Sequence, residues 1–309
     1  MFNLLRRKDL SARRTAFVCA SDGWATASVS RAGAGRPQLE SCNTFTAPPD
    51  AQERAITEKL ASMRGASGAV SCVMDPADYQ LLLIEMPDVL PAELRAAVRW
   101  RLKEAIDFPV EDAIVDVFDI PEQVRRTGSK MMYAIAAKRQ MVERHVSLMK
   151  SAPLFDVIDI PELALRNLAA QLPEAADGLI LLWLNDDSAK LLVVKQSTLY
   201  LTRHVQFAEN FGAPSEGPPP EVEAIALELQ RSTDYFESHY EQASINHLII
   251  APNSARTQSL TQYLSSETSM RVQLIDIERA LDCASGLEAP DHRGLLAIGA
   301  ALRSEQKSL

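Results

Sequence analysis

Residues 178–205 read GLILLWLNDDSAKLLVVKQSTLYLTRHV and predict three neighbouring strands joined by tight turns. Residues 179–184 and 190–194 are uninterrupted apolar runs, which are typical of buried strands. The residues between them, Asn-Asp-Asp-Ser at 185–188, favour a turn because short polar side chains hydrogen-bond their own backbone. A third strand is expected over residues 198–205. We expect this meander to open the second of two domains.

Length and composition define the class of protein. The chain has 309 residues, of which 47% are hydrophobic and 24% charged. Such a chain can bury substantial cores, and its length predicts about two domains. Its formal net charge is −9, and the sequence shows no basic stretch large enough to neutralise many phosphates. The negative charge and the lack of a basic stretch therefore argue against nucleic acid as a partner.

The cysteines and the apolar runs indicate a compartment. Cys19, Cys42, Cys72 and Cys283 lie far apart and form no Cys-x-x-Cys pair, so neither a zinc site nor a disulfide framework is predicted. A reducing cytoplasm fits this pattern. No run approaches the roughly 18 apolar residues that a membrane-spanning helix needs, and the start lacks the apolar region of a secretory signal.

The first fourteen residues combine apolar and basic side chains. The apolar ones are Phe2, Leu4 and Leu5, and the basic ones are Arg6, Arg7, Lys8, Arg13 and Arg14. Two interpretations stay open. This head is either a solvated tail or a segment that lies on an anionic membrane surface, where each basic residue adds about 1 kcal/mol of attraction.

A strongly patterned stretch, PAELRAAVRWRLKEAIDFPVEDAIVDVFDI, covers residues 91–120. Its first proline suits the first turn of a helix. Leu94, Val98 and Leu102 begin an apolar stripe that buries one helix face. Trp100 falls near the opposite face, so either a second packing face within the chain or a partner protein covers it.

The rest of the chain alternates strands and helices, as α/β proteins do. The other predicted elements are a hairpin at 15–29, helices at 51–63, 138–149, 221–240 and 256–264, strands at 69–74, 79–86, 113–120, 130–136, 155–160, 245–251 and 272–275, a helix that starts at 161 and a last helix around 295–302.

Five short matches in order resemble the PilM family, the cytoplasmic actin-like proteins of type IV pilus assembly. They are the helix that ends in Phe108-Pro109, Ala-Ala-Lys at 136–138, Asp-Ile-Pro at 159–161, Tyr-Leu-Thr-Arg at 200–203 and the closing AIGAALR at 297–303. Within this family the altered loops look most like those of the MSHA-pilus biogenesis protein MshI. The resemblance covers nearly the whole chain.

The resemblance implies an α/β chain with the actin-like ATPase (ribonuclease H-like) fold, built as two lobes with inserted subdomains. The implied divisions are residues 15–86 for the first part of subdomain 1A, 87–150 for an inserted subdomain (1B/1C), 151–209 for the end of the first lobe and the start of subdomain 2A, 210–275 for subdomain 2B, and 276–309 for the end of subdomain 2A.

The resemblance also places three loops around a nucleotide, and each departs from the family pattern. Cys19-Ala20 stands where the family has an Asp, Trp-Leu-Asn at 183–185 where it has Asp-Ile-Gly, and Ala-Pro-Asn-Ser-Ala at 251–255 where it has three glycines. Phosphate loops need glycines, which let backbone N–H groups face the anion, and a carboxylate that holds Mg²⁺. We therefore expect a pseudo-ATPase without catalytic or metal-binding residues. Its vestigial phosphate loops would contain Ser21, Asp22, Gly23, Asp187, Ser188 and Lys190, the last as the nearby cation.

Other enzyme signatures are absent from the sequence. The five histidines show no metal-ligand spacing, and no Walker loop or nucleophile elbow is present. Asp291 and His292 can be paired on paper, as can other acid–histidine pairs, and nothing in the sequence prefers one of them.

The resemblance implies a non-catalytic scaffold, peripheral at the cytoplasmic face of the inner membrane, that links the pilus motor platform to bitopic membrane proteins. A PilN-like partner would dock its cytoplasmic N-terminal segment in a groove between the first domain and its inserted subdomain. Trp100, Lys103 and Phe108 are the candidates for the wall of that groove. Two alternatives stay open: an active PilM-type protein that binds ATP with Mg²⁺, and the cytoplasmic part of a type II secretion platform protein similar to GspL. A homo-oligomer also stays open.

Overall fold

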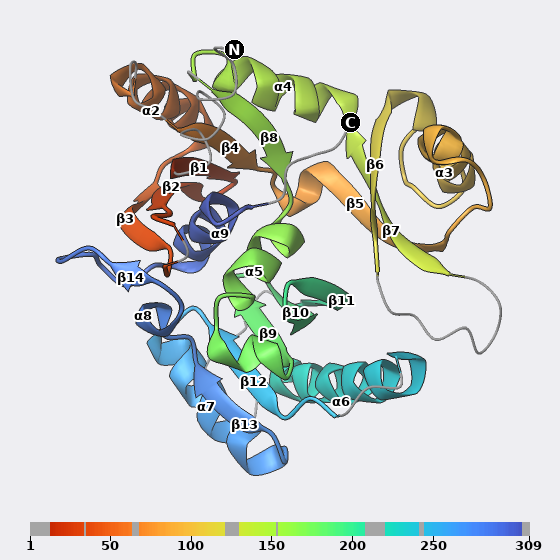
Figure 1. Cartoon of the computed structure of the whole chain (residues 1–309), viewed down its shortest axis with the longest axis vertical. Helices are drawn as coiled ribbons and strands as arrows, with labels where there is room; N and C mark the ends of the chain where they lie inside the picture. Colours follow the sequence, from red (N-terminus) through yellow and green to blue (C-terminus); the bar gives the residue numbers. More distant parts are fainter. Residues whose placement is uncertain are drawn as a thin grey trace.

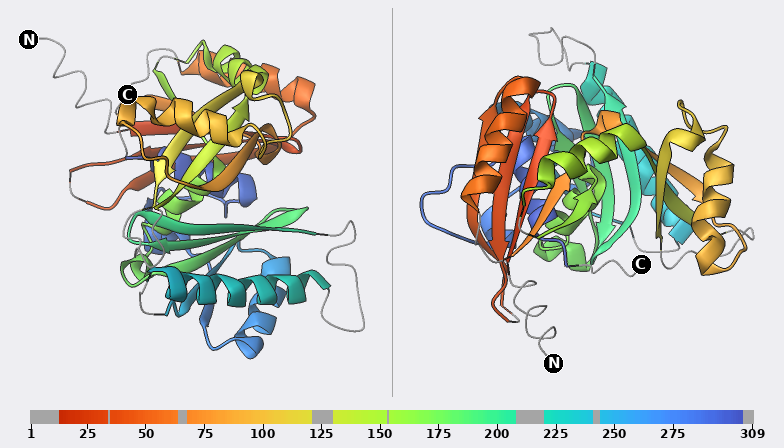
Figure 2. Two further views of the ribbon diagram at one scale, coloured as in Figure 1. Left: turned by 90° about the vertical axis from the view of Figure 1, so that its right-hand side faces the viewer. Right: turned by 90° about the horizontal axis from the view of Figure 1, so that it is seen from above.

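The computed structural model shows two lobes stacked on each other (Figure 1, Figure 2). The residues that it describes are 13–33, 35–63, 68–120, 130–152, 154–207, 220–240 and 244–304. Most of the basic head, residues 1–12, lies outside them, so its membrane contact stays a prediction. Among the described residues, no helix is both long and apolar enough to cross a membrane.

A six-stranded sheet forms the centre of the first lobe. Its strands are β1 (Arg13–Ala20), β2 (Gly23–Ser30), β3 (Gln38–Thr46), β4 (Ala69–Val73), β8 (Phe155–Asp159) and β14 (Asp282–Cys283). In the order β14-β3-β2-β1-β4-β8, the first three strands of the chain form an antiparallel meander, while β4 and β8 continue parallel to β1. The predicted first hairpin is therefore β1 and β2.

The second lobe repeats this topology. Its sheet contains β9 (Leu179–Leu184), β10 (Ser188–Lys195), β11 (Thr198–Gln206), β12 (His247–Ala251) and β13 (Arg271–Leu274), in the order β11-β10-β9-β12-β13. Again an antiparallel meander is followed by two parallel strands. The meander predicted from residues 178–205 is confirmed, and β9 is buried at all six positions, as the central strand of a sheet covered on both faces should be.

A smaller antiparallel sheet, which we call the inserted sheet, interrupts the first lobe. It contains β5 (Tyr79–Glu85), β6 (Ala113–Asp119) and β7 (Met131–Lys138), in the order β5-β7-β6. Helix α3 (Leu94–Leu102) buries Val98 and Leu102 against this sheet. The short helices η2 (Pro91–Glu93) and η3 (Val110–Asp112) flank α3, so the helix is shorter than the predicted one that ends at Phe108-Pro109.

The boundaries of the insertion differ from the expected 87–150. Strand β5 pairs with β7 over its full length, so the insertion already begins at Tyr79. Helix α4 (Arg139–Met149) contacts α2 (Pro49–Ser62) and β8 of the first lobe and also β6 and β7 of the inserted sheet, so it lies at the junction between the two. A run of apolar residues predicts a strand but not the sheet that it joins, which is why the inserted sheet begins before the expected residue 87.

Two helices cross between the lobes. Helix α5 (Pro161–Ala169) follows β8 of the first sheet but contacts β9, β10 and β11 of the second. Helix α9 (His292–Ala301) comes after the second sheet and packs on β1 to β4 of the first (Figure 1). The two helices contact each other so closely that a Cβ at Gly299 would overlap the backbone of Ala164. One hydrophobic cluster therefore unites α5, α9 and the facing sides of both sheets.

The outer helices complete the lobes and correct two further divisions. Helix α6 (Pro220–Tyr240) and α7 (Ala255–Glu267) cover the second sheet on the side away from the first lobe (Figure 2). Because β12 and β13 belong to that sheet, residues 210–275 do not form a subdomain apart from it. Residues 276–309 do not simply end subdomain 2A either, since β14 pairs with β3 and α9 packs on the first sheet. The short helices η1 (Pro76–Asp78), η4 (Pro173–Ala176) and α8 (Ile277–Ala280) connect these elements.

Candidate functional site

The two lobes enclose a pocket of about 430 Å³. Because the two sheets share one topology, the turn between β1 and β2 faces the turn between β9 and β10 across it. Helix η1 and the start of α9 complete the lining. Of the predicted phosphate-loop residues, Ser21, Asp22, Asp187 and Ser188 line this pocket. The structure thus brings the two turns together, as the resemblance implies.

The backbone of the first turn already has an acceptor. The Ser21 N–H donates to Oδ2 of Asp75 at 3.2 Å, and the Ala77 N–H donates to Oδ1 of the same carboxylate at 2.9 Å. Burial raises the pKa of Asp75, and the nearby carboxylates of Asp78 and Asp22 raise it further. A carboxylate therefore faces the pocket where a nucleotide phosphate would need N–H donors.

The second turn is closed by its own asparagine. Oδ1 of Asn185 accepts hydrogen bonds from the backbone N–H of Asp187 at 3.1 Å, the N–H of Ser188 at 2.7 Å and the hydroxyl of Ser188 at 3.0 Å. This is an Asx turn, in which the side chain replaces an outside acceptor. Trp183, two residues earlier, is buried, and its indole N–H donates to the His292 carbonyl at 3.1 Å.

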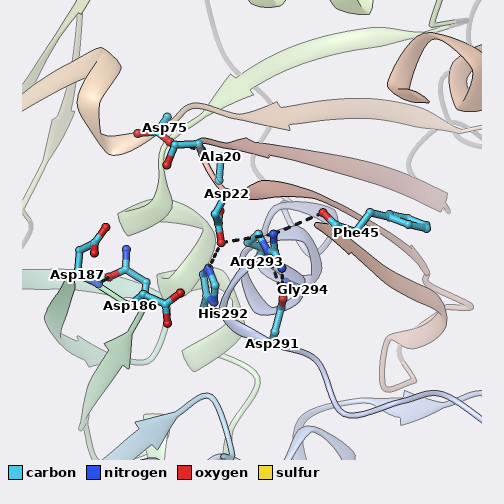
Figure 3. A network of polar contacts seen from close by, with 12 residues as sticks. Ala20, Asp22, Phe45, Asp75, Asp186, Asp187, Asp291, His292, Arg293 and Gly294 are labelled. Atoms are coloured by element: carbon cyan, nitrogen blue, oxygen red, sulfur yellow. Dashed lines mark hydrogen bonds and ion pairs between the residues drawn. The ribbon is translucent and has the colours of Figure 1, made fainter. Parts of the chain in front are cut away.

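Helix α9 brings the principal cation to the pocket (Figure 3). Arg293 donates to Oδ2 of Asp291 through Nε at 3.1 Å and Nη2 at 2.8 Å, while Oδ1 of Asp291 caps the helix by accepting the Gly294 N–H. Asp22 points at this helix start: its Oδ2 lies 3.4 Å from both Arg293 Nη1 and His292 Nε2. The Arg293 guanidinium therefore faces carboxylates of the chain itself.

Gly23 is needed for the fit between the first turn and α9. A Cβ at this position would overlap the Arg293 guanidinium and the Phe45 carbonyl. The predicted phosphate-loop glycine thus has a packing role, because it lets the end of the hairpin lie against the helix.

The charges that line the pocket are mainly negative. Four aspartates, 22, 75, 186 and 187, accompany one arginine and two histidines, His204 and His292. Burial lowers the pKa of His204, and nearby Lys190 lowers it further, which favours the neutral imidazole. A polyphosphate would meet more carboxylates than cations. No cluster of three or more His, Cys, Asp or Glu residues suited to a metal occurs in the described part of the chain.

Lys190 does not belong to this site, which corrects the sequence prediction. Its Nζ lies 2.6 Å from Oε1 of Glu162 on α5, and both side chains are buried. The Tyr79 hydroxyl donates to the other carboxylate oxygen of Glu162 at 2.5 Å. The lysine therefore connects β10 to α5 and β5, and it is not among the residues that line the pocket.

None of residues 251–255 of the third loop lines the pocket, although Arg256 at the start of α7 donates to the Asn185 carbonyl at 3.3 Å and lies 3.9 Å from Asp186. Ser254 caps α7 by accepting the Thr257 N–H, and its own N–H donates to the Thr257 hydroxyl. This reciprocal capping box satisfies the helix start without glycine. Sequence reasoning missed three residues that do line the pocket, namely Asp75, Arg293 and His204, because each comes from an element outside the expected loops.

The structure brings two of the three candidates for the partner groove together and places the third, Phe108, elsewhere. Trp100 is 75% exposed on α3, and the Lys103 ammonium lies 5.7 Å from its ring centroid. Phe108 is half-buried and lines a separate pocket of about 220 Å³ between η1 and the inserted sheet, with Tyr79 and Lys138. The described residues therefore provide no second packing face that covers Trp100.

Comparisons with known proteins agree with this architecture. No protein-family model and no curated protein matches the sequence. A chain of the PilM-PilN type IV pilus biogenesis complex is similar with a TM-score of 0.69 and 15% identity, covering 94% of this chain and 98% of that one. A Bacteroides thetaiotaomicron protein with actin-like ATPase fold and unknown function has a TM-score of 0.52 and 8% identity, covering 91% and 96%. The cytoplasmic domain of EpsL, an inner membrane component of the Vibrio cholerae type II secretion system, has a TM-score of 0.48 and 13% identity, covering 83% and 96%. The chain therefore has the actin-like ATPase fold, as the sequence resemblance implied.

Proposed function

We propose that this protein is a nucleotide-independent adaptor of type IV pilus assembly, of the MSHA type, peripheral at the cytoplasmic face of the inner membrane. The observation that carries the proposal is the occupation of both phosphate-facing turns by the chain's own oxygens. Asp75 accepts the Ser21 N–H, and Asn185 accepts those of Asp187 and Ser188. An actin-like fold keeps its pocket here but has filled the donor positions that a nucleotide requires.

The energetic argument follows from these contacts. A phosphate at the second turn would have to displace Asn185 from three hydrogen bonds, each with a net worth of about 1 kcal/mol. It would also approach Asp186 and Asp187 without the lysine expected from the sequence, because Lys190 is paired with Glu162, while Arg256 of α7 already lies 3.9 Å from Asp186. Repulsion and lost hydrogen bonds act in the same direction. We therefore expect neither ATP binding nor hydrolysis.

The partner half of the proposal rests on the fold and on one pocket. The similar PilM-PilN complex is an assembly of type IV pilus biogenesis, which supports a PilN-like inner-membrane protein as partner. The pocket lined by Phe108, Tyr79 and Lys138 lies between η1 of the first lobe and the inserted sheet. This is the junction expected for docking of a short N-terminal cytoplasmic segment. The exposed Trp100 on α3 is a second, separate contact candidate.

Two calorimetric titrations of the purified protein test the proposal. We expect no heat with Mg-ATP and saturable binding of the N-terminal peptide of a PilN-like protein from the same genome. Phe108→Ala should weaken peptide binding, and Trp100→Ala tests whether the exposed indole on α3 is a second contact with the peptide. Saturable ATP binding by the unmodified protein contradicts the loss of nucleotide binding, and absence of peptide binding contradicts the adaptor.

One observation favours an ATP-binding alternative. Arg293 and His292 stand at the back of a pocket of about 430 Å³, and an arginine is well suited to phosphate. If this alternative holds, Arg293→Gln should abolish the ATP heat while leaving binding of the peptide intact. If the adaptor proposal holds, the variant and the unmodified protein give the same flat ATP titration.

A further inference from the structure

A second cavity, of about 320 Å³, lies beside the β1–β2 turn between α2 and α4. Its apolar wall comes from Ile56 on α2, from Met141 and Leu148 on α4, and from Cys19 at the end of β1. Ser21, Asp75 and Ala77 line both this cavity and the pocket of about 430 Å³ between the lobes. For clarity we call it the α2–α4 cavity.

The polar residues of the α2–α4 cavity leave one carboxylate without a cation. Arg144 pairs with Glu53 at 2.7 Å, and His145 Nε2 lies 3.6 Å from Asp78. Asp75 is the third carboxylate, and the hydrogen bonds that it accepts come from the backbone of Ser21 and Ala77. The Asp75–Asp78 side of the cavity therefore carries more negative than positive charge.

The pKa of the Cys19 thiol in the cavity wall responds to the same charged side chains. Burial raises the pKa of Cys19 to about 12, Arg144 lowers it, and Glu53, Asp75 and Asp78 each raise it. The thiol stays protonated and contributes an apolar surface rather than a nucleophile. A suitable occupant therefore has an aliphatic body for the wall and a cation for the carboxylates.

We propose that the α2–α4 cavity receives a lysine side chain of the partner peptide. Its methylene stem packs on Ile56, Met141 and Leu148, and its ammonium lies against Asp75 and Asp78. A lysine combines an apolar stem and a charged head in one side chain. The site deepens the proposed adaptor function, on which it rests for the source of the peptide, but capture of the side chain itself is testable without a partner.

The contacts of Asp75 give this site a consequence for the cleft. Its two carboxylate oxygens hold the Ser21 and Ala77 N–H groups, and Ala77 also borders the pocket that contains Phe108. A lysine ammonium beside Asp75 would favour its ionised form, whose oxygens accept the Ser21 and Ala77 N–H groups. Partner binding would then favour the state in which the pocket between the lobes holds no nucleotide.

The test uses a small probe pair. Nα-acetyl-lysine methylamide and its neutral counterpart, Nα-acetyl-norleucine methylamide, are titrated into the full chain labelled with ¹³C at its methionine methyl groups. Met141→Leu identifies the Met141 signal. We expect the lysine probe to shift this signal and to bind about tenfold more tightly than the norleucine probe, a ratio typical of one favourable ion pair.

Charge variants provide the controls. Asp75→Asn and Asp78→Asn, each of nearly unchanged shape, should reduce the lysine preference, while Asp119→Asn on the exposed edge of the inserted sheet should retain it. Equal binding of the two probes, no shift of the Met141 signal at saturating probe, or a preference that survives both cavity variants overturns the proposal. Methyl spectra of each variant verify that it is folded.

The outcomes separate this proposal from the adaptor function. If the partner peptide binds but the lysine probe does not, the cavity proposal is wrong and the adaptor stands. If the probe binds and the partner peptide does not, the cavity site stands without the proposed partner.

Discussion

The buried Lys190–Glu162 pair allows a quantitative prediction about how the lobes are joined. The side chains of Lys190 and Glu162 are 8% and 4% exposed, and their charged atoms lie 2.6 Å apart. Lys190→Met leaves Glu162 buried, with the Tyr79 hydroxyl still donating to its carboxylate. Removing one partner of a buried ion pair costs about 3–5 kcal/mol, so we expect a loss of that size in the free energy of unfolding.

The assay is urea unfolding of a double-mutant cycle. Glu162→Gln alone should also cost several kcal/mol, because it leaves Lys190 buried without its charge partner. The double variant should be less destabilised than the sum of the single variants, with a coupling energy of about 2 kcal/mol or more. As a control, Arg54→Met removes an exposed pair with Glu58, whose side chains are 84% and 68% exposed, and should change stability by at most about 0.5 kcal/mol. A loss below about 1 kcal/mol for Lys190→Met, or additive effects in the cycle, would refute the reasoning.

Three further predictions concern other parts of the chain. Gly23→Ala should lower the free energy of unfolding by about 1–3 kcal/mol through overpacking against Arg293, as measured by urea unfolding. Gly35→Ala is the control and should be nearly neutral, because its Cβ would stay 3.4 Å from its nearest neighbour. Burial lowers the pKa of His204, so its contribution to stability is present above the unfolded-state pKa of about 6.5 and is lost as pH falls below that pKa. When the pH is lowered from about 7 to about 5.5, the His204→Gln variant should therefore lose less unfolding free energy than the unmodified protein. Parallel plots of unfolding free energy against pH for the two proteins would show that His204 is not involved. Trp100 is 75% exposed while the other two tryptophans are at most 5% exposed, so Trp100→Phe should remove most of the fluorescence that acrylamide quenches, and partner peptide that reaches α3 should protect it.

The sequence predicted local structure well because its signals are local. The meander of β9 to β11 follows from two apolar runs separated by turn residues, and all three strands lie where they were expected. The start of α5 follows from Pro161 at the first helical position. The stripe of α3 correctly identified Val98 and Leu102 as core residues, and placed Trp100 on the opposite face.

The site was harder to predict because its charges come from distant segments. Lys190 is two residues after the turn at 185–188, yet its strand directs the side chain to Glu162 rather than to the pocket. Arg293 and Asp75 enter the pocket from α9 and from the residue before η1, and no spacing in the sequence connects either of them to the turns. Asn185 was recognised as a turn residue, but the hydrogen bonds that close the turn became visible only in the fold.

The crossing of α9 has a consequence for the order of events during synthesis. Strands β1 and β2 are made long before α9, but Ala16, Val18 and Ala25 pack in the cluster to which α9 contributes. Residues 292–301 follow every described strand of both sheets and are made after them, at about 5–20 residues per second. The first sheet therefore keeps an uncovered apolar face until α9 has been made, and contacts of such long sequence separation form slowly. A nascent chain arrested before α9 should be captured by chaperones and cut by proteases, whereas release of the full chain should end both.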